Sequence, residues 1–202
     1  RTCFKVDYLW LVYATSEYLK YTSDTEILFE KVPFVVGDVL NDYEEEKGVS
    51  FTFSEHDETL YEHCRLAIER TLNDLGKHGL PKMGGGDWND GMNKIGIQGL
   101  GESVWLGFFF YDLLERFIQI TKIYNPNLDI SRYQEAREKL KNHLNKDAWD
   151  GEYYLRAFFD NGEAVGSLHS EECKIDLISQ SFSFLSSVVP TERKQSVLDA
   201  VE

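Results

Sequence analysis

The stretch ESVWLGFFFYDLLERFIQITKIY, from Glu102 to Tyr124, decides the fold. It predicts one long helix, which ends where Asn125-Pro126-Asn127 interrupts the pattern. Bulky apolar side chains lie on every side of its first half, so we expect other elements to cover all of its faces. Residues 6–22 and 175–188 have a similar apolar character and predict two more buried helices.

Three amphipathic segments alternate with these apolar ones. Residues 57–75, 131–145 and 191–201 each carry an apolar stripe at helical spacing and a polar face. An amphipathic helix faces water, whereas an apolar helix must be covered on all sides. The alternation therefore predicts an all-α fold with an inner layer of helices wrapped by an outer one. Six helices would make about half of a twelve-helix toroid, and we expect residues 1–202 to belong to one such domain.

Three further segments complete the chain. Residues 25–31 predict a short helix, and residues 37–56, rich in Gly, Asp, Glu and Ser, predict an exposed loop. Residues 153–159 (YYLRAFF) have the composition of a strand, and Asp160-Asn161-Gly162 predicts the turn that follows it.

Composition restricts the partners and the location. The chain has 202 residues and a formal net charge of −14, which argues against nucleic acid or an anionic membrane surface as a partner. The most apolar run, residues 104–111, is too short to span a membrane, so we expect no membrane contact from this segment. Three widely spaced cysteines indicate free thiols in a reducing compartment, and we expect the cytoplasm.

The stretch GLPKMGGGDWNDGMN, from Gly79 to Asn93, is the strongest candidate for a functional site. Three consecutive glycines predict a loop whose backbone bends sharply or comes close to another group. A tryptophan and two carboxylates follow at once. Carbohydrate sites use this combination, because an aromatic face covers a sugar ring while a carboxyl group acts on its oxygens.

Two readings of the carboxylates Asp87 and Asp90 remain open, and a third is excluded. A calcium loop is excluded, because its glycine would be sixth rather than fifth and Gln98 stands where a bidentate Glu is needed. We therefore expect no metal. One reading is a general acid, partly desolvated by the indole ring and apolar helices so that its pKa rises. In the other, Asp87, Asn89 and Asn93 only bond the backbone of the loop.

Several blocks of this sequence together resemble glycoside hydrolase family 94. In chain order these blocks are DYLWL (7–11), DETLYEHC (57–64), HGLP (78–81), GDWNDGMN (86–93), GESVWLG (101–107), YYLRAFFDNG (153–162) and EECKIDLISQS (171–181). The resemblance is collinear over nearly the whole chain. That family includes cellobiose and chitobiose phosphorylases. The later blocks of this sequence look closest to its branch of cyclic β-1,2-glucan synthases and β-1,2-oligoglucan phosphorylases.

This resemblance implies a fold and a reaction. The fold would be an (α/α)6 toroid, of which this chain would be a partial catalytic domain, with a β-sandwich before it and the rest of the barrel after it. The reaction would be inverting phosphorolysis, or the reverse synthesis, of β-linked gluco-oligosaccharides. Asp90 would be the proton donor, and inorganic phosphate would be the co-substrate, with no other cofactor.

The resemblance also implies residues that bind the substrate. Trp88 would line the sugar subsite beside the cleaved bond, and Asp7, with Arg1 in the same cluster, would hold the non-reducing sugar. Glu172 matches a carboxylate near the sugar subsites, although its place before the helix at 175–188 equally suits a helix cap. Arg156 could approach phosphate, but a salt bridge is the stronger expectation.

Three functions remain open on the sequence. The first is a glycoside phosphorylase, a transferase that uses phosphate or glucose 1-phosphate. The second is the phosphorylase-like region of a cyclic β-1,2-glucan synthase. The third is a carbohydrate-binding helical toroid without turnover, which would hold oligosaccharide equally well with or without phosphate. In each case half a toroid would leave apolar helices uncovered, so we expect a homodimer or aggregation if it is studied alone.

Overall fold

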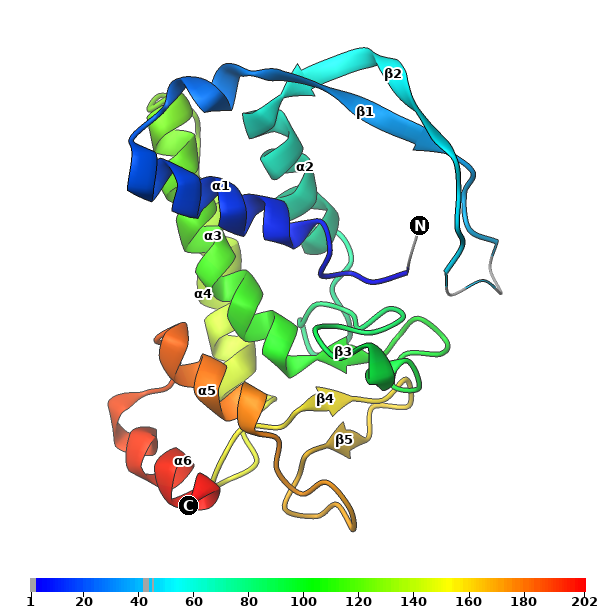
Figure 1. The fold of residues 1–202 in the computed structure, drawn as a ribbon. Coiled ribbons are helices and arrows are strands. Elements are labelled where there is room, and N and C mark those ends of the chain that lie inside the picture. Colours follow the sequence, from blue (N-terminus) through cyan, green and yellow to red (C-terminus); the bar gives the residue numbers. More distant parts are fainter. Residues whose placement is uncertain (1–2, 42–43, 45) are drawn as a thin grey trace.

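A long central helix organises the chain. In the computed structural model, which describes residues 3–41, 44 and 46–202, this helix is α3 (Val104–Tyr124). Every residue from Val104 to Tyr111 is buried, as the sequence predicts. Helices α1 (Leu9–Thr22), α2 (Leu60–Leu72), α4 (Ser131–Lys146) and α5 (Leu177–Leu185) all contact α3, and α4 runs alongside it (Figure 1).

The contacts between helices follow the predicted alternation. The apolar helices α1 and α5 both contact α3, and the amphipathic helices α2 and α4 contact it as well. The sixth helix of the described part of the chain, α6 (Lys194–Val201), packs on α5 and follows the 3-10 turn η3 (Thr191–Arg193). The predicted helical character of the chain is thus confirmed. No helix in the described ranges is long and apolar enough to cross a membrane.

The apolar helices at either end of this series are not covered on all sides. Trp10 and Leu11 of α1 are exposed, and so are Leu177 and Leu185 of α5. Complete burial, which the sequence predicts for residues 6–22 and 175–188, is therefore wrong for these two helices within the described residues. It holds for the first half of α3, from Val104 to Tyr111, whereas Gln119, Lys122 and Ile123 in its second half are exposed.

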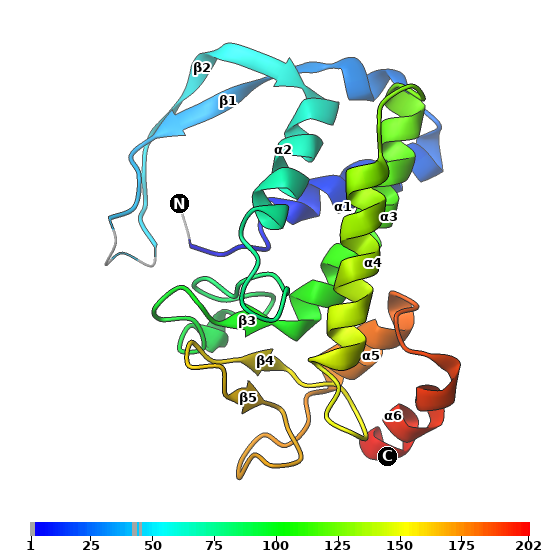
Figure 2. The same ribbon diagram turned by 180° about the vertical axis from the view of Figure 1, so that it is seen from behind.

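A β-hairpin stands where the sequence predicts an exposed loop. Strands β1 (Lys31–Gly37) and β2 (Phe51–Thr59) pair antiparallel, from Lys31 opposite Thr59 to Gly37 opposite Phe51. Figures 1 and 2 show the hairpin arching away from the helices. The loop predicted at 37–56 is confirmed for the described residues between 38 and 50 and is wrong for Gly37 and residues 51–56, which belong to strands. The helix begins at Leu60 and not at 57. Most side chains of both strands are exposed, so the sequence carries no alternation of burial that would reveal them.

The short elements also differ from the expected ones. Residues 26–29 form a 3-10 turn, η1 (Glu26–Phe29), instead of a helix over 25–31. A small antiparallel sheet joins β3 (Glu102–Ser103), β4 (Ala157–Phe158) and β5 (Ala164–Val165) in the order β3-β4-β5. The strand predicted over 153–159 is therefore only two residues long, and its turn at Gly162, with φ of 88°, is confirmed. The fold is mainly α, not all-α.

The three cysteines differ in accessibility, and this predicts their reactivity. All three are free; Cys173 is exposed, whereas burial raises the pKa of Cys64 to about 11 despite its contact with the Thr15 hydroxyl. Because the thiolate is the reactive form, we expect Cys173 to react with a disulfide reagent at pH 8 while Cys64 reacts only after unfolding. Mass spectrometry of the labelled native protein checks this. Cys173→Ser should remove the fast label, and fast labelling of native Cys64 would contradict the assignment.

Candidate functional site

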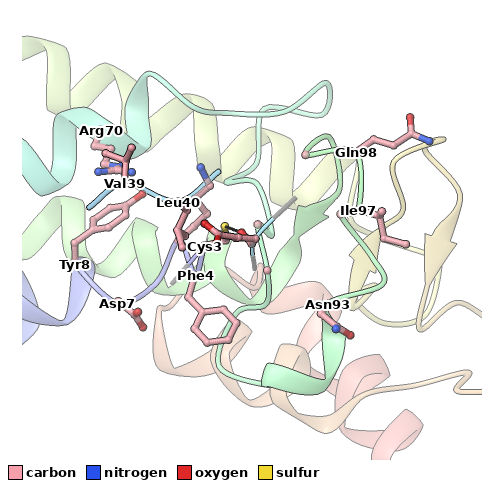
Figure 3. A pocket seen from close by; sticks show the side chains of 16 residues that line it. Cys3, Phe4, Asp7, Tyr8, Val39, Leu40, Arg70, Asn93, Ile97 and Gln98 are labelled. Carbon is pink, nitrogen blue, oxygen red and sulfur yellow. Dashed lines mark hydrogen bonds between the residues drawn. The ribbon is translucent and has the colours of Figure 1, made fainter. Parts of the chain in front are cut away.

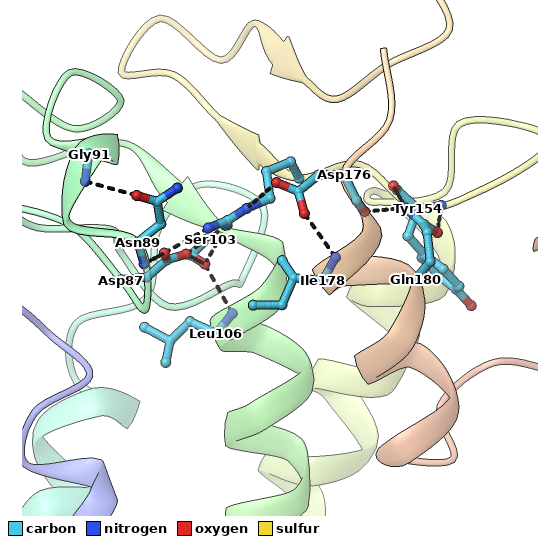
Figure 4. A network of polar contacts seen from close by, with 10 residues as sticks. Asp87, Asn89, Gly91, Ser103, Leu106, Tyr154, Asp176, Ile178 and Gln180 are labelled. Atoms are coloured by element: carbon cyan, nitrogen blue, oxygen red, sulfur yellow. Dashed lines mark hydrogen bonds and ion pairs between the residues drawn. The ribbon is translucent and has the colours of Figure 1, made fainter. Parts of the chain in front are cut away.

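Asp87 is buried, and all of its acceptor positions are used. Arg156 donates to it in a bidentate pair, from Nη1 to Oδ2 and from Nη2 to Oδ1, both at 2.7 Å. The Ser103 hydroxyl donates to Oδ2 at 2.5 Å, and the backbone N–H of Asn89 donates to Oδ1 at 3.0 Å. A carboxylate accepts about four hydrogen bonds, so Asp87 has no position left for a substrate. Figure 4 shows this network.

The turn that begins at Asp87 carries the following side chains outward. The Asn89 side chain accepts from the backbone N–H of Gly91 at 2.9 Å, and a 3-10 turn, η2 (Asp90–Met92), starts beside it. Trp88 is 63% exposed, and Asn89 and Asp90 are exposed too. Asp87 and Asn89 both bond the backbone of the loop, as the second reading predicts, but Asp87 does not do this alone, because it also pairs with Arg156 and Ser103. The turn leaves Asp90 as its accessible carboxylate.

The surroundings of Asp90 differ from the sequence-based expectation. The sequence predicts a carboxyl group partly desolvated by an indole ring and apolar helices, but both Asp90 and Trp88 are exposed. The buried network holds the base of the turn at Asp87 and leaves Trp88 and Asp90 exposed at its tip. Among the described residues, nothing supplies the predicted desolvation.

Arg156 joins the turn to the starts of two helices. It is 1% exposed, and its Nε lies 3.2 Å from Oδ2 of Asp176 in a second ion pair. Asp176 caps α5 by accepting from the backbone N–H of Ile178, and Ser103 caps α3 by accepting from that of Leu106. The expected salt bridge of Arg156 is thus confirmed. Its burial leaves no access for phosphate.

The glycine run makes the close backbone approach that the sequence predicts. Gly84 has φ of 66° and bridges Phe4, and a Cβ at Gly84 would lie 2.4 Å from the carbonyl oxygen of Cys3. Neither the dihedral angle nor the space admits another side chain. The run therefore docks the loop on the segment that precedes α1, and that segment carries Asp7.

A cavity of about 830 Å³ lies between these segments (Figure 3). Asp7 and Tyr8 line it from one side, and Asn93 with the loop at 96–99 lines it from another. The hairpin tip contributes residues 39, 40 and 44. The structure thus brings Asp7 and the glycine-rich loop to one cavity. Trp88 and Asp90 do not line it, although they belong to the same loop.

The remaining predicted residues stand apart. Glu172 is exposed in the segment before α5 and does not line this cavity. Its alternative role as the cap of α5 is wrong, because Asp176 holds that position. Arg1 lies outside the described residues.

Three side chains that anchor the site, those of Glu102, Ser103 and Asp160, are not among the residues predicted from the sequence. Ser103 could have been found, since a serine directly before a long helix is the usual N-cap. Glu102 is 2% exposed and accepts from the backbone N–H groups of His78 and Leu80, at 3.0 and 3.1 Å, and contacts Nδ1 of His78 at 2.6 Å. Asp160 looked like an ordinary turn residue. The partners of Glu102 and Asp160 lie 22 to 62 residues away, so local pattern does not reveal these two.

Asp160 holds the segment after η2 through three hydrogen bonds to its backbone. It accepts from the backbone N–H groups of Gln98, Leu100 and Gly101 at 2.8–2.9 Å. Burial by itself would raise the pKa of Asp160, but these bonds outweigh it and hold the pKa below its ordinary value. A lowered pKa stabilises the folded state above about pH 4, and this contribution is lost as the pH falls through the folded pKa.

We therefore expect the amides of residues 98–101 to lose hydrogen-exchange protection at pH 3 relative to pH 6 before the helices do. Protection factors corrected for intrinsic exchange measure this. In Asp160→Asn the same amides should be poorly protected at both pH values, because an amide oxygen accepts more weakly than a carboxylate. Equal protection of the parent at both pH values would contradict the role of Asp160.

The chain is similar to known carbohydrate-active proteins. The profile described as "Glycosyl hydrolase 94 superfamily, catalytic domain" matches residues 1–202. Cyclic beta-(1,2)-glucan synthase NdvB of Rhizobium meliloti is 37% identical over 201 residues, which is 100% of this chain and 7% of that protein. Solabiose phosphorylase of Paenibacillus borealis is 33% identical over 195 residues, covering 96% of this chain and 23% of that protein.

Two further comparisons extend this picture. N,N'-diacetylchitobiose phosphorylase of Vibrio proteolyticus is 26% identical, over 97% of this chain and 22% of its own length. A crystal structure of a GH78 family rhamnosidase of Bacillus sp. GL1 superposes with a TM-score of 0.54 at 16% identity, over 69% of this chain and 14% of that chain. This likeness concerns the fold alone. The chain thus spans less than a quarter of the length of these curated relatives.

Proposed function

Because the chain belongs to the glycosyl hydrolase 94 superfamily, we propose that it forms part of the (α/α)6 catalytic domain of an inverting glycoside phosphorylase. The reaction is phosphorolysis of a β-linked gluco-oligosaccharide, or synthesis in the reverse direction. Asp90 is the general acid and phosphate is the nucleophile. The relatives named as phosphorylases support this reaction class.

One observation carries the assignment of Asp90. The two carboxylates of the turn are in opposite situations: Asp87 is buried with every acceptor position filled, and Asp90 is exposed at the start of η2. Of the two acids in this turn, only Asp90 can reach a substrate, and phosphorolysis requires one such acid. A hydrolase needs two carboxyl groups, one to protonate the leaving oxygen and one to activate water or attack the sugar.

The chemistry then follows from the nucleophile. Phosphate is already an anion, so it attacks the anomeric carbon from the face opposite the leaving sugar without an enzymic base. The C–O bond to the leaving sugar breaks as Asp90 gives its proton to the glycosidic oxygen. The products are α-glucose 1-phosphate and the shortened sugar. In the reverse reaction Asp90 takes the proton from the attacking hydroxyl.

Other residues have supporting roles in this proposal. Trp88, exposed beside Asp90, covers a sugar ring next to the cleaved bond. Asp7 and Arg1 hold the non-reducing sugar, and Glu172 lies near the sugar subsites. The proposal includes no metal and no cofactor besides phosphate. The free thiols support the cytoplasm as its location.

A second candidate is the phosphorylase-like region of a cyclic β-1,2-glucan synthase. The observation that favours it is the match to the glucan synthase over all of this chain at 37% identity. The two candidates share the chemistry of Asp90 and differ in the acceptor and in the flanking sequence. We propose the phosphorylase first, because several relatives that match nearly all of this chain are named as phosphorylases.

The test is an assay of the full-length protein with phosphate and a panel of β-linked gluco-oligosaccharides. We expect phosphate-dependent formation of glucose 1-phosphate in the α configuration, seen by proton NMR at early times. Release of glucose without phosphate would indicate a hydrolase. Oligosaccharide binding that is independent of phosphate, without turnover, would indicate a binding module and overturn the proposal.

A further inference from the structure

We propose that Asp87 and Arg156 are positioning residues that hold Asp90 in place during proton transfer. This inference rests on the proposed function, and it concerns residues that do not touch the substrate. It starts from the connection between the buried pair and the exposed acid. Asp87 lies three residues before Asp90, and hydrogen bonds join its carboxylate to Asn89 and the Asn89 side chain to Gly91, the two residues that flank Asp90 in the chain (Figure 4).

The connection on the side of Asp90 consists of two successive turns. The carboxylate of Asp87 accepts from the N–H of Asn89, and the side chain of Asn89 accepts from the N–H of Gly91 at 2.9 Å. The carbonyl oxygen of Asn89 accepts from the N–H of Met92 at 3.0 Å. Asp90 therefore lies between Asn89, whose backbone bonds the Asp87 carboxylate directly, and Gly91, whose backbone bonds the side chain of Asn89. A rotation of that carboxylate would move the backbone that carries the acid.

Arg156, the partner of Asp87 on the side away from Asp90, is itself held firmly in place. Both backbone groups of Arg156 are bonded, since its N–H donates to Val165 at 2.7 Å and its carbonyl accepts from Val104 at 3.2 Å. Gly166 packs so closely that a Cβ there would lie 2.8 Å from Cβ of Arg156. The guanidinium also pairs with Asp176, at the start of α5. Arg156 thus fixes the position of the turn relative to the small sheet and to the starts of α3 and α5.

A positioning role explains why an ion pair stands at this buried place. Such a pair stabilises a fold little more than apolar side chains of the same volume would. A bidentate arginine and carboxylate, however, fix both distance and orientation. General acid catalysis depends on that precision, because a displacement of about 1 Å can lower a rate by about 10²-fold.

The experiment compares two substrates that differ in whether their leaving group needs a proton. Loss of positioning should affect only the substrate that needs one, whereas structural damage should affect both. An aryl β-glucoside with a dinitrophenolate leaving group departs without a proton, whereas an oligosaccharide needs one. Full-length Asp87→Asn and Arg156→Lys keep the size and part of the bonding of the parent residues. The matched control is Arg116→Gln, which breaks an arginine paired with Glu17 and Asp112 between α1 and α3.

We expect Asp87→Asn and Arg156→Lys to lower kcat on the best oligosaccharide by about 10–100-fold with KM within about twofold of the parent value. Turnover of the aryl glucoside should fall by less than about threefold. Asp90→Asn should show the same selectivity more strongly, and Arg116→Gln should lower both activities equally or neither.

Each other outcome has a distinct meaning. If Asp90→Asn is selective but Asp87→Asn and Arg156→Lys lower both activities in parallel, the pair is structural and the inference fails alone. If both variants keep parent activity on the oligosaccharide, the inference also fails alone. If the parent forms no glucose 1-phosphate from any oligosaccharide, the proposed function fails and the inference falls with it.

Discussion

Replacing Asp90 with Asn is expected to lower kcat for the oligosaccharide by about 10²–10⁴-fold, the range that general acid help supplies. Asn keeps the size of the side chain but has no proton to give. Because Asp90 is exposed, the free energy of unfolding should change by less than about 0.5 kcal/mol. The reverse reaction offers a sensitive measurement, namely phosphate release from α-glucose 1-phosphate in the presence of glucose or oligosaccharide acceptors.

The matched control is Asp199→Asn, another exposed aspartate, which lies on α6 and contacts only Gln195 among the described hydrogen bonds. It should retain parent activity. The assignment of Asp90 would be wrong if its Asn variant kept more than about a tenth of parent kcat, since general acid help is worth at least about 10²-fold.

The second large effect concerns stability. Arg156→Met should lower the free energy of unfolding by about 3–5 kcal/mol, because it leaves the Asp87 carboxylate buried without its cation. Urea unfolding of the full-length protein, followed by tryptophan fluorescence, measures the shift in midpoint. The partly exposed Arg116, changed to Gln, should cost about 1 kcal/mol or less.

A double variant tests the physical cause. Arg156→Met combined with Asp87→Leu removes both charges, so it should be more stable than Arg156→Met alone. If the double variant is instead less stable by the sum of the two single effects, the pair is not coupled, and the cost of an unpaired buried charge is not the reason.

The helices could be predicted from the sequence because their signals are local. The 102–124 segment shows its apolar surface within one window, and α3 begins two residues later only because Glu102 and Ser103 pair with Ala157 and Phe158. The hairpin at 31–59 was missed because its exposed valines and phenylalanines show no buried face. Strand pairing of this kind depends on a partner some twenty residues away and not on composition.

The candidate site, like the fold, could be predicted only in part from the sequence. The DWND motif marks the candidate turn in the sequence, but composition treats its two aspartates alike. Their difference comes from Arg156, which is 69 residues distant from Asp87, and from Ser103 at the start of α3. The exposure of Asp90 could not be read from its neighbours in sequence either, because it depends on which end of the turn is anchored.

The small sheet has a consequence for the order in which the protein folds. Strand β3 ends where α3 begins, and β4 follows α4, so the pairing of Glu102 with Phe158 closes a loop that contains both helices. Forming the helical hairpin first shortens this loop and lowers the entropy lost on closure. We expect the α3–α4 hairpin to form before the sheet. Arg156 should pair with Asp87 only after the sheet has formed. A newly made chain would then form α3 and α4 before it forms the buried ion pair that holds the candidate site.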